Sequence, residues 1–578
     1  MLKQNRLVIA TGLLYLILAL GHIPVDIFPY GFDKNAPVHF VFLMIIAITY
    51  AAYIVIRHNR FELPLKVIAL IWGLVIAVLA STLRAPDLIG SLTGDSGRYT
   101  GAVSLLCLIA VAIFHSQFSL DQIHKIVQIF VTTIFIISVI GILQHHKIID
   151  MPGDVGVTGT LGNLDFFGAY VGTGFALFVY LLPTVPRKRK ILFAFFILVE
   201  LYAVYLAGPL QSYVDIAIIL IAVLIYKFRA YLPRYDLTLN VKTFFGTLGV
   251  IIWLEGIFLM PFIGSFIPVL GNDIQVQIRG QFWLAATRQF FSAPLTGVGP
   301  DHYGSYYEQY RTVLSVQENP TLLANDAHAA PAQTLATLGI LGIIAFVLLL
   351  ALLVRAFCIL DQRDPKNRYR YAAIGLYLFV FTTNAAISPI TLPHKFLFWA
   401  LAGFIIGEAY RGVSVNRNLR YRVISAALIP ALIMPTAYTL INFVPAQLDY
   451  LRATDKAVSG QRIDLKYNNF LPCIIYYPSI ASMISKNGEK DLIIFAQDQI
   501  NGNPNCIEAW ITLAKISYNQ GDLPVMKKII YELIEIAPSR QQVINLAALY
   551  ANKAGDEYLD DLVDKQLMKL NPGLIVVK

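Results

Sequence analysis

Long apolar segments recur along most of this 578-residue chain, and they limit its fold more than any other feature. About 13 of them are long enough to cross a bilayer, which takes roughly 20 helical residues. Only helices and closed barrels satisfy every backbone hydrogen bond in lipid. The segments therefore predict an all-α fold, a polytopic bundle of membrane helices. They lie near residues 7–25, 38–56, 65–82, 99–115, 126–144, 165–183, 190–207, 209–226, 243–263, 333–358, 371–387, 394–409 and 423–441.

The composition agrees with a membrane protein. Hydrophobic residues make up 57% of the chain and charged residues 14%, against roughly 25% charged in an average soluble domain. The net charge of +9 would suit a nucleic-acid-binding protein if it were spread evenly. However, residues 1–440 contain 31 basic and 21 acidic groups, whereas residues 441–578 contain 14 and 15. Membrane topology explains this excess better than nucleic-acid binding, which we exclude.

The basic residues also predict an orientation. Alternate connections on one side of the membrane, together with the N-terminus, hold 23 of these 31 basic residues, and the other side holds 8. Basic loops stay in the cytoplasm, so we expect a cytoplasmic N-terminus. An odd number of spans then places residues 442–578 outside. We therefore expect a transmembrane domain over 1–441 and an extracytoplasmic domain over 442–578.

The C-terminal domain has a 34-residue periodicity. The repeated residues are Pro504, Pro538 and Pro572, and the pair Gly521-Asp522, which returns as Gly555-Asp556. Together with Trp510 and Tyr518, they are typical of tetratricopeptide helix–turn–helix repeats. Such arrays offer a concave surface to a protein partner, and a structural cap is the alternative.

Cysteine and acidic motifs predict neither a metal site nor a cofactor. The four cysteines form no C-x-x-C pair and no Cys/His cluster at zinc spacing. The chain contains no Asp-x-Asp motif that would hold a metal on a diphosphate. Cys107 and Cys358 lie in apolar spans, whereas Cys473 and Cys506 can form a disulfide if their domain faces an oxidising compartment.

One connection differs from the rest. Residues 264–332 form an external loop of about 70 residues, and loops this long in compact proteins are usually functional or disordered. The aromatic and basic residues from Arg279 to Phe291 suit an interfacial helix, so we expect the loop to be ordered. His302 lies in the middle of this loop. His328 precedes the next span by five residues, where an imidazole can act as a general base near neutral pH.

Acidic residues also interrupt the spans. Glu200, Asp215 and Glu255 lie within apolar segments, and Asp165 opens another. Intramembrane acids are costly to bury and are functional candidates by default. In the expected orientation all four lie towards the outer face, which favours a polar cavity that opens outwards. The alternative is that each acid caps a helix or bonds a neighbouring span.

The segment His328-Ala-Ala-Pro-Ala-Gln-Thr-Leu-Ala-Thr-Leu-Gly339-Ile-Leu-Gly342 resembles the one that defines the bacterial O-antigen ligase and polymerase family, which includes pilin O-oligosaccharyltransferases. In that family a histidine ends the large periplasmic loop, and two glycines follow at this spacing. Other stretches resemble further family elements in the same order, over roughly residues 100–410. These are Gly162-Asn163, Arg279-x3-Trp283 and Pro294-Leu-Thr-Gly297-Val-Gly299.

The resemblance implies a metal-independent, inverting glycosyltransferase. Such enzymes move a glycan from a polyprenyl-diphosphate carrier to a lipid, protein or glycan hydroxyl at the outer face of the membrane. In that role His328 accepts the proton of the acceptor, and Arg279 binds the diphosphate. We expect substrate binding also to involve Asn163, Trp283, Tyr213, Asp215, Arg288 and Arg311.

The chain departs from the family pattern in two places. The family's second arginine follows a serine, but here the stretch reads Gln211-Ser212-Tyr213, so Arg288 or Arg311 is expected to substitute. The family's asparagine and glutamate after the histidine are replaced by Ala330 and Thr337.

Three other functions stay open. A polymerase differs from a ligase only in its acceptor. A transporter or flippase would show an internal repeat, and we find none in residues 1–440. A membrane-anchored scaffold would leave the long loop without a purpose.

Overall fold

The computed structural model describes residues 2–21, 35–56, 63–95, 97–151, 156–228, 274–318, 322–413, 419–459, 461 and 473–570. Helices and short connections make up all of these residues, and no strand occurs among them. The predicted all-α fold is therefore confirmed for the described part of the chain.

Apolar helices form the larger part of the structure. Within the described ranges, eight helices are long and apolar enough to cross a membrane, and two shorter apolar helices cover Leu7–Leu20 and Ala102–His115. The bundle helices are α1 (Leu2–Leu20), α2 (Ala36–Ile56), α3 (Leu65–Arg84), α5 (Ala102–His115), α6 (Leu120–His145), α7 (Leu164–Leu181), α8 (Lys190–Ala207), α9 (Leu210–Phe228), α16 (Ala330–Arg363), α17 (Arg368–Ile387), α18 (Leu392–Tyr410) and α19 (Leu419–Val458).

Within the described residues, helices occupy twelve of the 13 expected spans. The expected span at 243–263 and the acid Glu255 lie outside the described residues. Helices α17 and α18 occupy two expected spans but fall outside the set of eight. Nearly every residue of α18 is buried among its neighbours, so this helix needs no lipid-facing surface and tolerates His394 and Lys395.

The described part of the loop expected to be external contains three helices. They are α13 (Ile274–Ser292), α14 (Tyr303–Tyr310) and α15 (Val313–Glu318). Phe282 and Trp283 of α13 are buried against α14 and the segment that leads into α16. The aromatic residues of α13 thus serve mainly as the core of the folded loop, although Phe291 stays exposed.

The C-terminal residues form six consecutive helices. These are α20 (Cys473–Ser485), α21 (Glu489–Gly502), α22 (Ile507–Gln520), α23 (Leu523–Ile536), α24 (Gln541–Ala554) and α25 (Glu557–Leu570). The repeated Gly-Asp pair is explained by its turn. Gly521 ends α22 in the left-handed conformation, and the Asp522 carboxylate then accepts a hydrogen bond from the Val525 amide at 3.2 Å to start α23. Gly555 and Asp556 make the same turn before α25.

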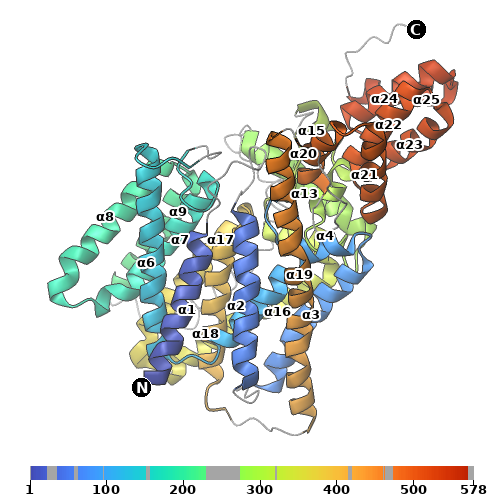
Figure 1. Ribbon diagram of the computed structural model, residues 1–578. Coiled ribbons are helices and arrows are strands. Elements are labelled where there is room, and N and C mark those ends of the chain that lie inside the picture. The colour runs from blue at the N-terminus through green and yellow to red at the C-terminus, as the bar shows by residue number, and fades with distance from the viewer. Residues whose placement is uncertain are drawn as a thin grey trace.

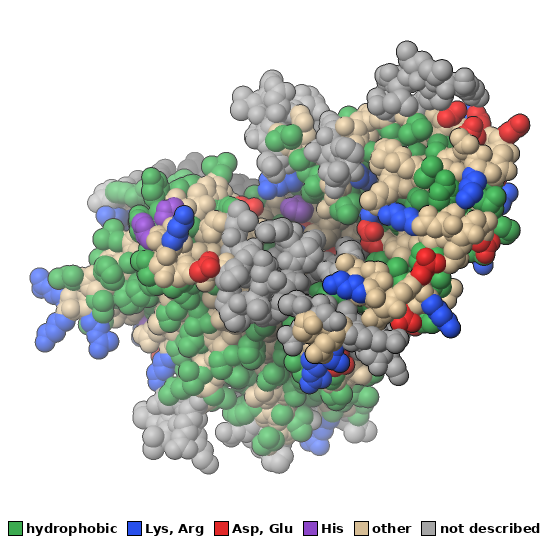
Figure 2. All heavy atoms as spheres, turned by 45° about the horizontal axis from the view of Figure 1, so that its top comes forward, with side chains coloured by type: hydrophobic (Ala, Val, Ile, Leu, Met, Phe, Trp, Pro, Cys, Tyr) green, Lys and Arg blue, Asp and Glu red, His purple; other side chains and the backbone are tan. Residues whose placement is uncertain are grey.

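The two groups of helices lie at different ends of the molecule. In Figure 1 the N-terminus lies at one end of the bundle, and α21 to α25 gather at the opposite end. The long helix α19 runs beside α2, α3 and α5 and leads towards the C-terminal helices. Figure 2 shows hydrophobic side chains over most of the visible bundle, whereas acidic and basic side chains mix on the C-terminal helices. The loop helices α13 to α15 lie between these two groups.

Candidate active site

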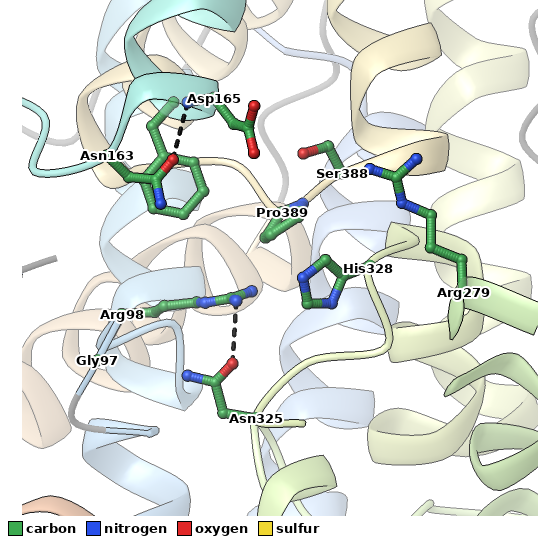
Figure 3. A pocket seen from close by; sticks show the side chains of 10 residues that line it. Gly97, Arg98, Asn163, Asp165, Arg279, Asn325, His328, Ser388 and Pro389 are labelled. Atoms are coloured by element: carbon green, nitrogen blue, oxygen red, sulfur yellow. Dashed lines mark hydrogen bonds between the residues drawn. The ribbon is translucent and has the colours of Figure 1, made fainter. Parts of the chain in front are cut away.

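A polar cavity lies where four connections of the bundle meet helix α13. Its volume is about 120 Å³. Figure 3 shows His328 near its centre, with Arg98 on one side and Arg279 on the other. The lining residues are Gly97, Arg98, Asn163, Asp165, Phe166, Arg279, Asn325, His328, Ser388 and Pro389.

A tight turn at Asp326 places His328. The His328 backbone amide donates to Asp326 Oδ1 at 2.6 Å, and His328 has a φ of 54°. A left-handed backbone is unfavourable for a residue with a Cβ, and the aspartate side chain stabilises it through a local turn. The turn sends the imidazole into the cavity just before α16 begins.

Hydrogen bonding defines which nitrogen of His328 is a base. Nδ1 lies 2.9 Å from the Asp326 carbonyl oxygen. A carbonyl only accepts, so the bond assigns the proton to Nδ1 and leaves the lone pair on Nε2. Burial and the nearby charge of Arg98 lower the pKa of His328 to about 4. The imidazole is therefore neutral at pH 7 and able to accept a proton.

The two arginines of the cavity differ in their bonding. The Arg98 guanidinium lies 3.0 Å from the Asp326 carboxylate and donates to Asn325 Oδ1 at 2.9 Å. Burial raises the pKa of Asp326, but Arg98 and the His328 amide outweigh it and hold the pKa below its ordinary value. Arg279 makes no hydrogen bond or ion pair with any residue that the structure describes, which leaves its five donors available to an anion.

Buried aspartates behind the cavity hold its loops in place. Asp301 Oδ2 accepts from the backbone amides of Asp95 at 2.8 Å and Thr100 at 3.2 Å. Gln333 Nε2 donates to Asp301 Oδ1 at 3.3 Å, and its own oxygen accepts from the Ala327 amide at 2.9 Å. Burial and the nearby carboxylates raise the pKa of Asp301 to about 7. This cluster connects the segment that carries Arg98 to the turn that carries His328.

The two glycine motifs of the sequence dock on each other. Helix α16 breaks at Gly339, where φ is 62° and ψ is −159°. The loop after α13 lies along the break, so that the Val298 amide donates to Ala336 at 2.9 Å and the Ile340 amide donates to Pro294 at 3.0 Å. A Cβ on Gly297 would lie 2.3 Å from the Thr337 carbonyl carbon. Both motifs thus need glycine for close backbone approach, and they anchor the loop beside His328.

The cavity brings together some of the predicted site residues. His328, Arg279 and Asn163 all line it, as does Asp165. The Asn163 side chain also caps α7 by accepting from the Asp165 amide at 2.8 Å.

The other predicted substrate-binding residues lie elsewhere. Arg288 donates to the carbonyls of Tyr310 and Arg311, and Arg311 is buried with its guanidinium on Ser315. Trp283 lies in the core of the loop. Tyr213 is exposed on α9 and donates to the Tyr205 carbonyl at 3.4 Å. None of these residues lines the cavity, so the geometry favours no contact with a ligand there.

The remaining acids and the second loop histidine have local partners or lie apart from the cavity. Asp215 is buried between helices and accepts from Asn384 at 2.8 Å and Thr173 at 3.4 Å. Glu200 is buried within α8. His302 precedes α14 and bonds Ser305 and the Asp87 carbonyl. These contacts favour structural roles for His302 and Asp215.

Sequence reasoning missed Arg98, Asn325 and Ser388. Arg98 was the easiest of the three to predict, because it is one of only 8 basic residues expected on the outer side. A search of that side for guanidiniums outside the long loop would have found it. Among the described residues, no group of three or more His, Cys, Asp or Glu side chains is arranged to hold a metal ion.

Two comparisons with known proteins give no match. No family model matches the chain, and no curated protein matches it. The resemblance to the O-antigen ligase family therefore stays a prediction.

Proposed function

We propose that the protein is a membrane glycosyltransferase of the O-antigen ligase type. It would transfer a glycan from a polyprenyl-diphosphate carrier to an acceptor hydroxyl. The observation that carries the proposal is the neutral imidazole of His328, with its Nε2 lone pair unprotonated, between two guanidiniums in one cavity. A base and a cationic anion site side by side are what an attack on a diphosphate-linked sugar requires.

The arginines suit the leaving group. A guanidinium binds phosphate oxygens through two parallel charge-assisted hydrogen bonds. Arg279 has its donors available, so it would hold the diphosphate directly. Arg98 already pairs with Asp326, so it would add charge from the other side while keeping the His328 turn in place. Arg98 thus takes the place of the family's second arginine, which the chain lacks at Tyr213.

The reaction follows from these positions. His328 Nε2 takes the proton of the acceptor hydroxyl as its oxygen bonds the anomeric carbon. The bond between that carbon and the diphosphate oxygen breaks, and its electron pair leaves with the diphosphate held by Arg279. Direct displacement inverts the anomeric centre. The imidazolium then returns its proton to water, which regenerates the neutral base.

An extracytoplasmic site is part of the proposal. The excess of basic residues supports a cytoplasmic N-terminus. Cys506 is disulfide-bonded, and disulfides persist in oxidising compartments. Cys107 and Cys358 are free cysteines, and the side chain of Cys473 lies outside the described residues. The C-terminal helix pairs, with their repeated Gly-Asp turns, support a tetratricopeptide-like array that recognises a bulky acceptor.

A transfer assay tests the proposal. Purified protein receives a polyprenyl-diphosphate-linked oligosaccharide and, in separate reactions, a lipid, a protein and a glycan acceptor, and mass spectrometry identifies the product. His328→Ala should lower transfer by roughly 10²–10⁴-fold. Intact donor in every reaction with the native protein would contradict a transferase, and movement of uncut donor across vesicles would support a flippase. A product extended only on the glycan acceptor would indicate a polymerase.

Variants of one helix separate the roles of its arginines. Arg279→Ala should weaken binding of the lipid diphosphate. Arg288→Ala changes the same residue type on the same helix, but its guanidinium contacts backbone carbonyls away from the cavity. Donor affinity that falls equally in both variants would show that Arg279 has no special place.

A further inference from the structure

The C-terminal helices bind the external loop through a buried ion pair. Arg540, just before α24, lies 3.2 Å from the Glu308 carboxylate of α14 and also pairs with Glu508 of α22. The Glu308 side chain is 6% exposed and that of Arg540 16%. Next to them, the Ser539 hydroxyl donates to the Glu308 carbonyl at 3.1 Å. One guanidinium thus links the loop to two helices of the C-terminal domain.

A second contact lies at the far end of that domain. Val316 of α15 belongs to the hydrophobic core of helices α22 to α25. The neighbouring Gln317 side chain donates to the Lys569 carbonyl of α25 at 2.9 Å. The loop is therefore held at two points, α14 and α15, and the domain is docked on it.

Helix α14 in turn contacts α13, the helix whose Arg279 lines the cavity. The Tyr303 hydroxyl donates to the Phe282 carbonyl at 2.9 Å, and Gln289 of α13 donates to the Tyr303 carbonyl at 3.0 Å. The Phe282 ring lies against the His328 imidazole, with centroids 5.1 Å apart. The contacts run without a gap from Arg540 through Glu308 and α14 to Phe282 and His328.

The charges of this junction depend on Arg540. Burial raises the pKa of Glu308, and Arg540 and Arg311 oppose that shift. Without Arg540, the carboxylates of Glu308 and Glu508 would lie close together with less positive charge between them. Each would be stabilised by water instead, so α14 would move away from the C-terminal domain.

We infer that Arg540 is a positioning residue for the cavity, because it fixes α14 through Glu308 and so sets the place of Phe282 behind the His328 imidazole. The inference rests on the proposed function for its activity readout. A displacement of about 1 Å at a reacting group can lower a rate on the order of 10²-fold. The C-terminal domain would then act on catalysis as well as on acceptor choice.

The test uses the full-length protein with Arg540→Ala, Arg540→Lys and, as a matched control, Lys527→Ala. Lys527 is exposed and forms its ion pair with Asp556, inside the C-terminal domain, instead of with Glu308. We expect kcat for glycan transfer to fall on the order of 10²-fold in Arg540→Ala, to recover partly in Arg540→Lys, and to stay at the native value in Lys527→Ala. Adding Glu308→Gln to Arg540→Ala should lower kcat no further, since both changes remove the same pair.

Two measurements decide the inference without any activity. Hydrogen exchange of residues 303–310 should rise in Arg540→Ala while that of residues 541–570 stays unchanged. The rate at which diethyl pyrocarbonate modifies His328, mapped by mass spectrometry, should also change. Native exchange in α14, or a native kcat, would overturn the inference. If the native protein transfers no glycan, only the proposed function is refuted. The hydrogen exchange of α14 and the modification rate of His328 still decide the role of Arg540.

Discussion

Gly339→Ala tests the idea that the break in α16 places the loop that follows α13. Gly339 has a φ of 62° and a ψ of −159°, a region that is almost confined to glycine and costs roughly 1–3 kcal/mol for other residues. An added Cβ would lie 2.7 Å from three backbone atoms, the Gly297 nitrogen and the Leu295 carbonyl carbon and oxygen. Such overpacking typically costs roughly another 1–3 kcal/mol. Together the substitution should destabilise this junction by about 2–6 kcal/mol.

Hydrogen exchange reads this junction directly. The amides of Val298 and Gly299 donate to Ala336 and Thr337 across the break, at 2.9 Å and 3.2 Å. If local opening becomes easier by at least 2 kcal/mol, exchange at these two amides should accelerate about 30-fold or more, since 1.4 kcal/mol is a factor of ten. Glycan transfer should fall with it, because the same loop carries Asp301, which holds Gln333 and through it the Ala327 amide next to His328.

Gly280→Ala is the matched control. Gly280 follows Arg279 on α13, and a Cβ there meets nothing within 4 Å. Alanine should stabilise that helix by roughly 0.5–1 kcal/mol and leave the exchange of Val298 unchanged. Native exchange and native transfer in Gly339→Ala would refute the reasoning, because the backbone would then accommodate a side chain at the break.

The remaining predictions concern charge and cross-linking. As the pKa of His328 is about 4, kcat/KM should stay level down to about pH 5 and fall below about pH 4. As the pH is lowered, kcat should begin to fall at a higher pH than kcat/KM does. A kcat/KM midpoint near 6.5 would contradict the neutral buried base. The lowered pKa of His328 also makes the stability of the fold depend on pH. The contribution is complete above about pH 6.5, and chemical denaturation should show it lost as pH falls towards 4. Asp326→Ala should cost about 3–5 kcal/mol on thermal unfolding, because it removes the only carboxylate that pairs with the largely buried Arg98 among the described residues, whereas a loss within 0.5 kcal/mol would make the pair irrelevant. Cys506→Ser should lower stability by about 2–5 kcal/mol, and the control Cys358→Ser, a free cysteine, should unfold at the native temperature.

The sequence predicts the bundle well because a span must be apolar over its whole length, whatever its neighbours are. It does not show which spans are covered by other helices: nearly all of α18 is buried, which lets this helix carry His394. The helical loop and the Gly-Asp turns were also predictable, since their signals are local. The close approach of Gly297 and Gly339 was not, because it joins two motifs from different helices.

The cavity shows the same division. His328 and Arg279 lie close to motifs that the sequence displays, and the fold brings both to one cavity. Arg98 belongs to a short connection far away in sequence, and the hydrogen bonds of this connection to Asp301 and Asn325 bring it there. Tyr213 was expected at the cavity because of its place in a motif, but α9 directs it to the outer surface of the bundle. The rotation of α9 about its axis decides which way the side chain points, and a short sequence motif does not encode that rotation.

The charges around His328 suggest why a base with so low a pKa suits the proposed reaction. In the free protein, burial and the nearby guanidiniums keep the imidazole uncharged. It can therefore accept a proton, but it is a weak base. A bound diphosphate would bring negative charge to Arg98 and Arg279 and remove most of their effect on the imidazole. The pKa of His328 would then rise, and its basicity would increase only when the leaving group is in place. Water that enters the cavity when no diphosphate is bound would encounter His328 in its less basic state.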